Sequence, residues 1–331
     1  MHVYDNVLHL SATDLAKHLA CRHLTDLDRA VAEGRLDPPD WHDPALALLR
    51  ERGLAHETAY VQHLRGQGKN VVDLRDFEEV NAVARTRAAM VEGAEVIVQA
   101  SLQDGCWGGR ADVLLRVSEP SQLGDWSYEP LDTKLAMETR GGTILQLCLY
   151  ADLVGRVQGR SPERMHVVKP GEGFPVETFR FAEFEAYYRL VSRRLEQAVA
   201  GAPSSISPEP VPMCETCRWS RCCDSRRRAD DHLSFVAGLR SLHIDEIKRQ
   251  GAATLAAFAE QEVPLQERPQ RGHIHAFAKG HEQARIQLRG RNEGRPIHTR
   301  LPILPGLGLN LLPEPSPGDL FFDIESDPFV A

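Results

Sequence analysis

An acidic and a basic residue at the end of an apolar strand most constrain the fold of this chain. The segment Glu129–Leu135 contains Asp132 and Lys134, two positions apart. Since side chains alternate across a β-strand, both point to the same side. Residues 107–117 form a second expected strand, whose apolar half packs in a core while Asp112 faces the other way. We therefore expect an α/β fold in which neighbouring strands bring these three charged side chains together.

Two carboxylates and an ammonium in one site are typical of metal-assisted phosphodiester hydrolysis. Carboxylate oxygens suit a hard divalent cation such as Mg²⁺, which keeps water molecules for chemistry. Lys134 would orient or deprotonate the attacking water and stabilise the charge that builds on phosphate. The Asp-x-Lys triplet alone is a weak signal, because it occurs by chance in most proteins of this size.

Three further polar residues lie in order around these strands. A helix that begins after Asp43-Pro44 carries His56. Gln146 and Tyr150 are four positions apart and share a helix face. Each also has an ordinary explanation, a histidine on a helix surface and a partly buried polar pair. The order and spacing of the whole set favour a nuclease centre.

In this order the residues resemble the RecB-like branch of the PD-(D/E)XK nuclease superfamily, over about residues 8–230. The resemblance implies a restriction-endonuclease-like αβββαβ core with a helical cluster-binding lobe. No expected position of the active site is missing, which argues against an inactive enzyme. The resemblance implies that Lys134, Asp112 and Asp132 act in catalysis. It implies that His56, Asp112, Asp132 and the Thr133 carbonyl bind Mg²⁺ or Mn²⁺. Gln146 and Tyr150 would position the nucleic acid.

Four of the seven cysteines form a second pattern. Cys214, Cys217 and Cys223 lie within ten residues, whereas Cys21 lies far upstream and would join the two ends of the nuclease fold. Four thiolates suit zinc or an iron–sulfur cluster, and local spacing does not separate the two. A zinc ribbon would need a second close cysteine pair, which the sequence lacks.

The resemblance favours iron over zinc at these cysteines. RecB-like relatives with one early cysteine and a late Cys-x2-Cys-x5-Cys carry a 4Fe–4S cluster, and zinc is kept as the alternative. The family spacing selects Cys223 rather than its neighbour Cys222. Cys106, in an expected hairpin turn, and Cys148, on the apolar face of the Gln146 helix, are expected to be ordinary residues.

Composition and charge agree with a nucleic-acid enzyme of a reducing compartment. The chain has 331 residues and a net charge of −8, but Lys and Arg gather in residues 218–228 and 268–300, where they could follow a phosphate backbone. Its first residues are not an apolar signal segment, and no apolar run would span a membrane. We therefore expect cytoplasmic localisation, free thiols and no membrane partner.

The chain divides into four expected parts. Residues 1–230 form the nuclease domain with its cysteines. Residues 231–262 form a small helical module, either helix-hairpin-helix-like or simply structural, and residues 263–317 form a basic extended linker. Residues 318–331, which contain Asp323 and Glu325, resemble the truncated first strand of a ribonuclease-H-like exonuclease domain. We expect the rest of that domain in a longer polypeptide and assign no catalytic role to these two acids here.

The expected function is a metal-dependent DNA nuclease in repair, recombination or nucleic-acid processing. By resemblance, single-stranded or frayed DNA is its substrate, and RNA stays open. Two rivals belong to other classes: a non-catalytic iron–sulfur or zinc scaffold that binds nucleic acid, and a structural zinc adaptor.

Overall fold

A mixed sheet organises the first of the two compact units into which the chain divides, Met1–Asp230 and Asp231–Ala331. The structure is a computed structural model that describes residues 1–77, 79–202 and 208–324. Its strands are β1 (His2–Tyr4), β2 (Val7–Ser11), β3 (Val71–Asp73), β4 (Val96–Asp104), β5 (Trp107–Val117), β6 (Ser127–Thr133), β7 (Arg164–Val168) and β8 (Val176–Arg180).

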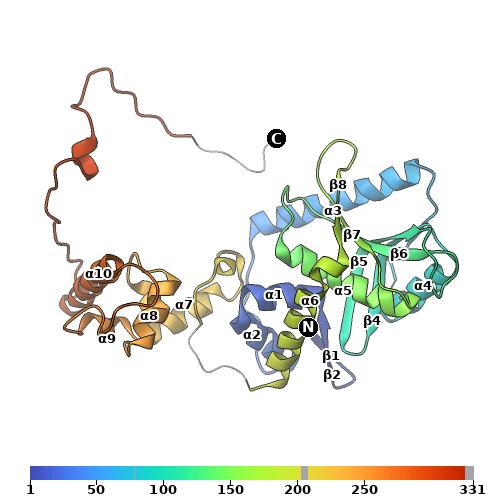
Figure 1. Ribbon diagram of the computed structural model, residues 1–331, viewed down its shortest axis with the longest axis horizontal. Coiled ribbons are helices and arrows are strands. Elements are labelled where there is room, and N and C mark those ends of the chain that lie inside the picture. Colours follow the sequence, from blue (N-terminus) through green and yellow to red (C-terminus); the bar gives the residue numbers. More distant parts are fainter. Residues whose placement is uncertain (78, 203–207, 325–331) are drawn as a thin grey trace. The chain divides into compact units, whose positions relative to one another are not determined.

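Helices accompany this sheet along the whole first unit, so the fold class is α/β (Figure 1). Their bounds are α1 (Ala12–Ala20), α2 (Arg22–Ala32), α3 (Pro44–Gly66), α4 (Glu79–Val91), α5 (Gly141–Gln158), α6 (Phe181–Ala200), the 3-10 helix η1 (Pro212–Thr216) and α7 (Ser220–Ala229).

The centre of the sheet is the antiparallel trio β4, β5 and β6. Strand β7 joins β6 in parallel and β8 returns antiparallel to β7, while β3 lies parallel to β4. The register pairs Val113 with Leu131. Continued by one position, this register brings Asp112 of β5 beside Asp132 of β6, which places two carboxylates on neighbouring strands.

Helices pack on both faces of the sheet (Figure 1). On one face α3 contributes Tyr60, Val61 and Leu64 to an apolar group, which we call the α3 cluster. On the other face α5 contributes fully buried leucines such as Leu147 and Leu149 to a larger group, the α5 cluster, which α1, α4 and α6 complete. The part of the sheet that carries the two aspartates therefore lies between two layers of helices.

The expected helix starts are confirmed. Asp14 of α1 accepts hydrogen bonds from the backbone N–H and the hydroxyl of Ser11, at 2.8 and 2.7 Å, and so fixes the first turn. Asp43 caps α3 by accepting from Ala45 and Leu46, with Pro44 in the first turn. Helix α1 ends at Ala20, and Cys21 follows it directly. The sequence predicts this place for Cys21, because a helix that runs through Leu15, Leu19 and Ala20 would end near it.

The strands expected from the sequence are also found, with small shifts of their ends. The sequence predicts strands at residues 95–101, 107–117, 127–135 and 164–169, which correspond to β4, β5, β6 and β7. It also predicts a helix at residues 183–200, which is α6. The short strands β1, β2, β3 and β8 were not expected, because runs of three to five residues carry little periodicity. Helices α2 and α4 were not expected either.

The second unit corrects the prediction of an extended linker over residues 263–317. Helix α10 (Ile274–Glu293) occupies much of that range, and it packs with α8 (Ser241–Arg249), α9 (Leu255–Ala259) and the 3-10 helix η2 (Leu233–Phe235). Phe277 and Ala284 of α10 are fully buried. Their spacing of seven puts them on one helix face, and the many charges between them masked this pattern.

The chain after α10 lacks the expected strand of an exonuclease domain as far as it is described. Residues 312–324 contain neither helix nor strand, after the short 3-10 helix η3 (Gly308–Leu311). Leu320, Phe321 and Phe322 are almost fully exposed. A strand is held by hydrogen bonds to a neighbour, and no described neighbour pairs with this segment. Glu325 and the positions after it lie outside the described residues.

The apolar content of the helices bears on the membrane prediction. Within the described part of the chain, none of the helices combines the length and apolar character that crossing a bilayer requires.

Candidate functional site

The middle of β5 and the end of β6 hold the first candidate centre. Asp112 Oδ2 accepts hydrogen bonds from the Thr133 backbone N–H at 2.8 Å and from the Thr133 hydroxyl at 3.0 Å. Lys134 lies one residue beyond β6, but its backbone N–H donates to the Val168 carbonyl at 3.0 Å and so continues the pairing with β7. Its side chain therefore stays on the same side as Asp132, and the two form an ion pair.

Helix α5 completes this centre from above the sheet. Gln146 Nε2 donates to Asp132 Oδ1 at 3.3 Å and to the Tyr150 hydroxyl at 3.0 Å. Tyr150 packs on Gly109 of β5, where an added Cβ would lie 2.6 Å from the tyrosine ring. A glycine is therefore required there for α5 to approach. The structure thus brings together Asp112, Asp132, Thr133, Lys134, Gln146 and Tyr150, all of which were named from the sequence.

Asp132 is the electrostatic focus of the centre. Its side chain is fully buried, and its Oδ2 atom forms the ion pair with the Lys134 ammonium. Burial raises the pKa of this carboxyl to about 8; the Asp112 carboxylate adds to the shift, and Lys134 opposes it. One ammonium does not balance two carboxylates, so a divalent cation beside Asp112 and Asp132 would offset the remaining charge, and these oxygen donors suit Mg²⁺ or Mn²⁺.

The raised pKa predicts that Asp132→Asn stabilises the protein when divalent ions are absent. Between about pH 4 and pH 8 the folded state holds a proton that the unfolded chain releases, so this carboxyl lowers the free energy of unfolding as pH rises. Asparagine removes the titration. We expect a gain of roughly 1–3 kcal/mol at pH 8 and a smaller one at pH 5. Urea unfolding in a chelator measures both values.

The control for this experiment is Asp125→Asn, which changes an exposed aspartate of the same unit. It should leave the free energy of unfolding unchanged at both pH values. Saturating Mn²⁺ should stabilise the wild type more than the Asp132→Asn variant. A variant that is less stable than the wild type at pH 8 in chelator would contradict the account of Asp132 as a strained, partly protonated carboxyl.

His56 differs from the other expected ligands. It lies half-buried on α3, and its ring packs against Phe174 with 5.7 Å between the centroids. Its Nε2 atom is buried and has no hydrogen-bond partner. In the described part of the chain no hydrogen bond or ion pair joins it to either aspartate. The structure therefore leaves a buried ring nitrogen available but does not connect it to the carboxylates.

Glu57, the next residue, was missed by the sequence reasoning. It is 8% exposed and accepts a hydrogen bond from Gln99 at 2.8 Å. Burial raises its pKa, and the nearby Asp112 carboxylate raises it further, so the two acids face one another. The spacing of Glu57, Tyr60 and Val61 puts the glutamate on the buried face of α3. That spacing was the signal that the sequence offered.

Strand β4 is distorted opposite Asp112. Gln99 has a φ of +54°, which is rare outside glycine, and it would be the partner of Asp112 in the β4–β5 register. The alternation of faces breaks here, because Val98 belongs to the α3 cluster whereas Ala100 belongs to the α5 cluster. Backbone strain of this kind persists where the surrounding structure imposes it, often at functional sites.

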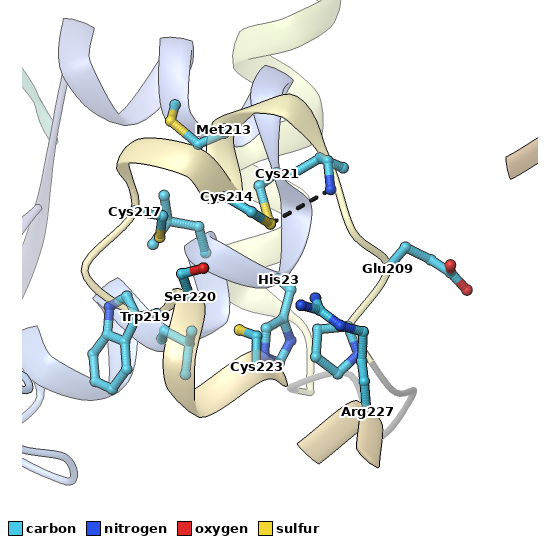
Figure 2. A pocket seen from close by; sticks show the side chains of 14 residues that line it. Cys21, His23, Glu209, Met213, Cys214, Cys217, Trp219, Ser220, Cys223 and Arg227 are labelled. Carbon is cyan, nitrogen blue, oxygen red and sulfur yellow. Dashed lines mark hydrogen bonds between the residues drawn. The ribbon is translucent and has the colours of Figure 1, made fainter. Parts of the chain in front are cut away.

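A second candidate centre lies where the N-terminal helices meet the end of the unit (Figure 2). Cys21 lies at the junction of α1 and α2, Cys214 in η1, Cys217 at the end of η1, and Cys223 in α7. All four line one pocket. The three cysteines assigned no ligand role do not line it: Cys222 is exposed, Cys148 is buried in α5, and Cys106 lies in the β4–β5 turn.

Burial favours the protonated form of two of the thiols in this pocket. It raises the pKa of Cys21, and it raises the pKa of Cys223 to about 11, against the opposing charge of Arg227. Within residues 1–77, 79–202 and 208–324, no three His, Cys, Asp or Glu side chains are already closed around one point as a metal ion requires. A metal that used these thiols would have to displace their protons.

An ion-pair bridge fixes the cysteine segment to the N-terminal helices. Asp28 of α2 is 7% exposed and pairs with Lys17 of α1 at 2.7 Å and with Arg218, beside Cys217, at 3.1 Å. Arg29 also donates to the Gly201 carbonyl at 2.6 Å. These contacts join segments far apart in the sequence and place Cys21 opposite the three later cysteines.

Comparisons with known proteins add little to this geometry. The comparison with family models finds no matching family, and the comparison with curated proteins finds no match. Among solved structures, one titled "Crystal structure of SSO0001" is similar to this chain with a TM-score of 0.36 and 14% identity, over 68% of this chain and 90% of that one. A likeness at this level identifies neither a fold family nor an activity.

Proposed function

We propose that this protein is a metal-dependent DNA nuclease with a PD-(D/E)XK core of the RecB-like kind. The observation that carries the proposal is the fully buried Asp132, which lies between Lys134 and Gln146 and next to Asp112. Burying a carboxyl group beside a second carboxylate is costly, and a carboxyl perturbed in this way is typical of a functional site. The succession of α3, β4, β5, β6, α5 and β7 agrees with an αβββαβ core.

The acidic residues would hold Mg²⁺ or Mn²⁺. Asp112, Asp132 and the Thr133 carbonyl are the proposed ligands, with the unpartnered Nε2 of His56 as a fourth. Glu57, close to Asp112, adds an acidic oxygen that the family pattern did not require. When bound, the cation lowers the pKa of a water molecule and offsets charge on the phosphate.

The other residues of the centre bind and orient the substrate. The β6–β7 pairing places the Lys134 side chain beside Asp132, where its ammonium form could hold a water and its neutral amine form could take a proton from it. Gln146 bridges Asp132 and Tyr150, so it can keep the phosphodiester backbone in line with the carboxylates. Burial raises the pKa of Tyr150, which keeps the phenol neutral and able to donate a hydrogen bond.

The four-cysteine pocket is proposed to hold a 4Fe–4S cluster, with zinc as the alternative. Its support is the convergence of Cys21 with Cys214, Cys217 and Cys223 in one pocket. A cluster there would join the two ends of the unit and act as a structural staple. Free thiols of this kind suit a reducing compartment such as the cytoplasm.

Charge supports a single-stranded or frayed DNA substrate next to the cysteine lobe. Helix α7 exposes Arg221, Arg226 and Arg228, and the last two pair with neighbouring acids on the helix surface. Exposed arginines of this kind can exchange such partners for phosphate. Helix α10 of the second unit exposes basic residues of its own.

Cleavage of end-labelled DNA tests the proposal. Protein purified without oxygen should cut single-stranded DNA or frayed duplex ends with Mg²⁺ or Mn²⁺ and not with a chelator. Asp112→Asn, which keeps an oxygen for the Thr133 hydrogen bonds, should reduce the rate at least about 100-fold. The affinity of this variant for DNA should stay within about twofold of the wild-type value, because one metal-binding carboxylate contributes little to the contacts with the DNA backbone.

The outcome also separates the rival functions. If the wild type binds DNA and carries its cluster but cuts no substrate with either ion, the protein is a nucleic-acid-binding scaffold. If it contains zinc and binds no nucleic acid, it is a structural adaptor. RNA of the same sequence, run in parallel, shows which nucleic acid is the substrate.

A further inference from the structure

Three buried N–H-bearing groups without a hydrogen-bond partner line the cysteine pocket. They are Trp219 Nε1, Arg227 Nη1 and His23 Nδ1. Figure 2 shows all three side chains around the sulfur atoms, with the Arg227 guanidinium and the His23 ring on the Cys223 side. Three of the five such unpartnered buried side-chain atoms in the described chain therefore gather at one pocket, which also holds four thiols.

Two of these groups can only donate. Indole and guanidinium nitrogens have no acceptor capacity, so each needs an acceptor when it is buried. Trp219 is 4% exposed and Arg227 is 5% exposed, so water does not readily satisfy them. A cysteine sulfur of the chain alone is a weak acceptor. The pocket thus presents strong donors but lacks strong acceptors.

Neighbouring contacts hold both donor side chains in place at the pocket. Arg227 Nη2 lies 3.5 Å from Asp224, one turn earlier on α7, whereas Nη1 is buried without a described partner. The Arg218 guanidinium lies 5.7 Å from the Trp219 ring centroid and is itself bound to Asp28. Neither side chain can turn to solvent without breaking these contacts.

We propose that Trp219 and Arg227 donate hydrogen bonds to sulfur atoms of a sulfide-bearing iron cluster held by the four cysteines, with His23 as a third donor. The identity of the cluster rests on the proposed function, whereas the hydrogen-bond donors are side chains that the structure describes. The positive charge of Arg227 then favours the reduced cluster, because reduction adds negative charge beside it.

Zinc satisfies these donors less well than an iron–sulfur cluster. A zinc site offers only its four thiolate sulfurs, and Cys214 Sγ already accepts the Val211 backbone N–H at 3.4 Å. A 4Fe–4S cluster adds inorganic sulfides as acceptors and spreads them through the pocket. The number and direction of the donors therefore match a cluster with its own sulfide.

The test compares three variants of the full chain, purified without oxygen. Arg227→Gln removes the charge, and Trp219→Phe keeps an aromatic ring but removes the N–H group. Arg221→Gln is the matched control, since Arg221 is exposed on the same helix. Each protein is assayed for iron and acid-labile sulfide, for the cluster's reduction equilibrium with dithionite, and for the rate of cluster loss to an iron chelator.

Arg227→Gln should lower the equilibrium constant for reduction about tenfold, which is 59 mV for a one-electron couple. It should also lose its cluster severalfold faster than the wild type. Trp219→Phe should change both quantities in the same direction but less, and Arg221→Gln should match the wild type. A change in potential separates hydrogen bonding to the cluster from a merely structural role, which would alter the rate of loss alone.

Two results would overturn the inference. The first is a colourless wild type that contains zinc and no acid-labile sulfide. The second is agreement of Arg227→Gln and Trp219→Phe with the Arg221→Gln control in both potential and rate of cluster loss. Neither readout needs DNA cleavage, so a protein that never cuts DNA can still satisfy the inference. An active nuclease that contains zinc would refute the inference about the cluster but not the proposed nuclease function.

Discussion

Replacing Lys134 by alanine is expected to slow DNA cleavage by about 10³-fold while leaving the protein folded. The ammonium forms the ion pair with Oδ2 of Asp132. Alanine removes a positive charge near the phosphate, and it also removes a side chain that could take a proton from the attacking water in its neutral amine form. Single-turnover cleavage of end-labelled DNA in Mn²⁺ measures the effect on the chemical step.

The fold should survive this change because Asp132 can take up a proton. With its pKa already raised to about 8, the carboxyl becomes neutral more readily once the ammonium is gone, so no unpaired charge stays buried. Lys69→Ala, at an exposed lysine of the same unit, is the matched control and should cut at the wild-type rate. Wild-type cleavage by the Lys134→Ala variant would remove the catalytic role that we propose for this residue.

The largest structural effect is expected from Cys21→Ser. Serine keeps the size of the side chain but replaces a thiolate ligand with a poor one, so bound iron should fall at least about tenfold. The N-terminal helices would then be held to the cysteine segment by the Asp28 ion pairs and pocket packing alone. We expect the melting temperature to fall by roughly 5–10 °C. Metal analysis and thermal unfolding measure the two effects.

Cys222→Ser provides the comparison for Cys21→Ser. Cys222 is exposed and adjacent to Cys223, so it tests whether any thiol near the pocket matters or only those that line it. Full iron content and an unchanged melting temperature are expected. If Cys21→Ser retained its iron while Cys222→Ser lost it, the ligand set would consist of the late cysteines and a group other than Cys21.

Much of the first centre was predictable because it lies on regular elements. Strand alternation placed Asp132 and Lys134 on one side, and helix spacing placed Gln146 with Tyr150, both of which the structure reproduces. The depth of burial was not predictable. The sequence gives no sign that Asp132 is fully buried, because burial depends on helices that pack from distant parts of the chain.

The errors have equally local causes. The break in alternation at Gln99, opposite Asp112, depends on a single left-handed residue, which periodicity treats as ordinary strand. Glu57 was passed over for its neighbour His56, because the sequence reasoning weighed residue type rather than the face of α3. Helix α10 was mistaken for an extended linker because its charges outnumber buried residues such as Phe277 and Ala284.

The position of Cys21 has a consequence for how the protein is made. The ribosome delivers this residue early, but Cys223 follows only after about 200 more residues, or roughly 10–40 s of synthesis at ordinary rates. Until then α1 and α2 have no cysteine partners, and Asp28 lacks Arg218. The N-terminal helices therefore emerge before the segment that they contact, and a metal that bound all four cysteines could be inserted only after α7 had emerged.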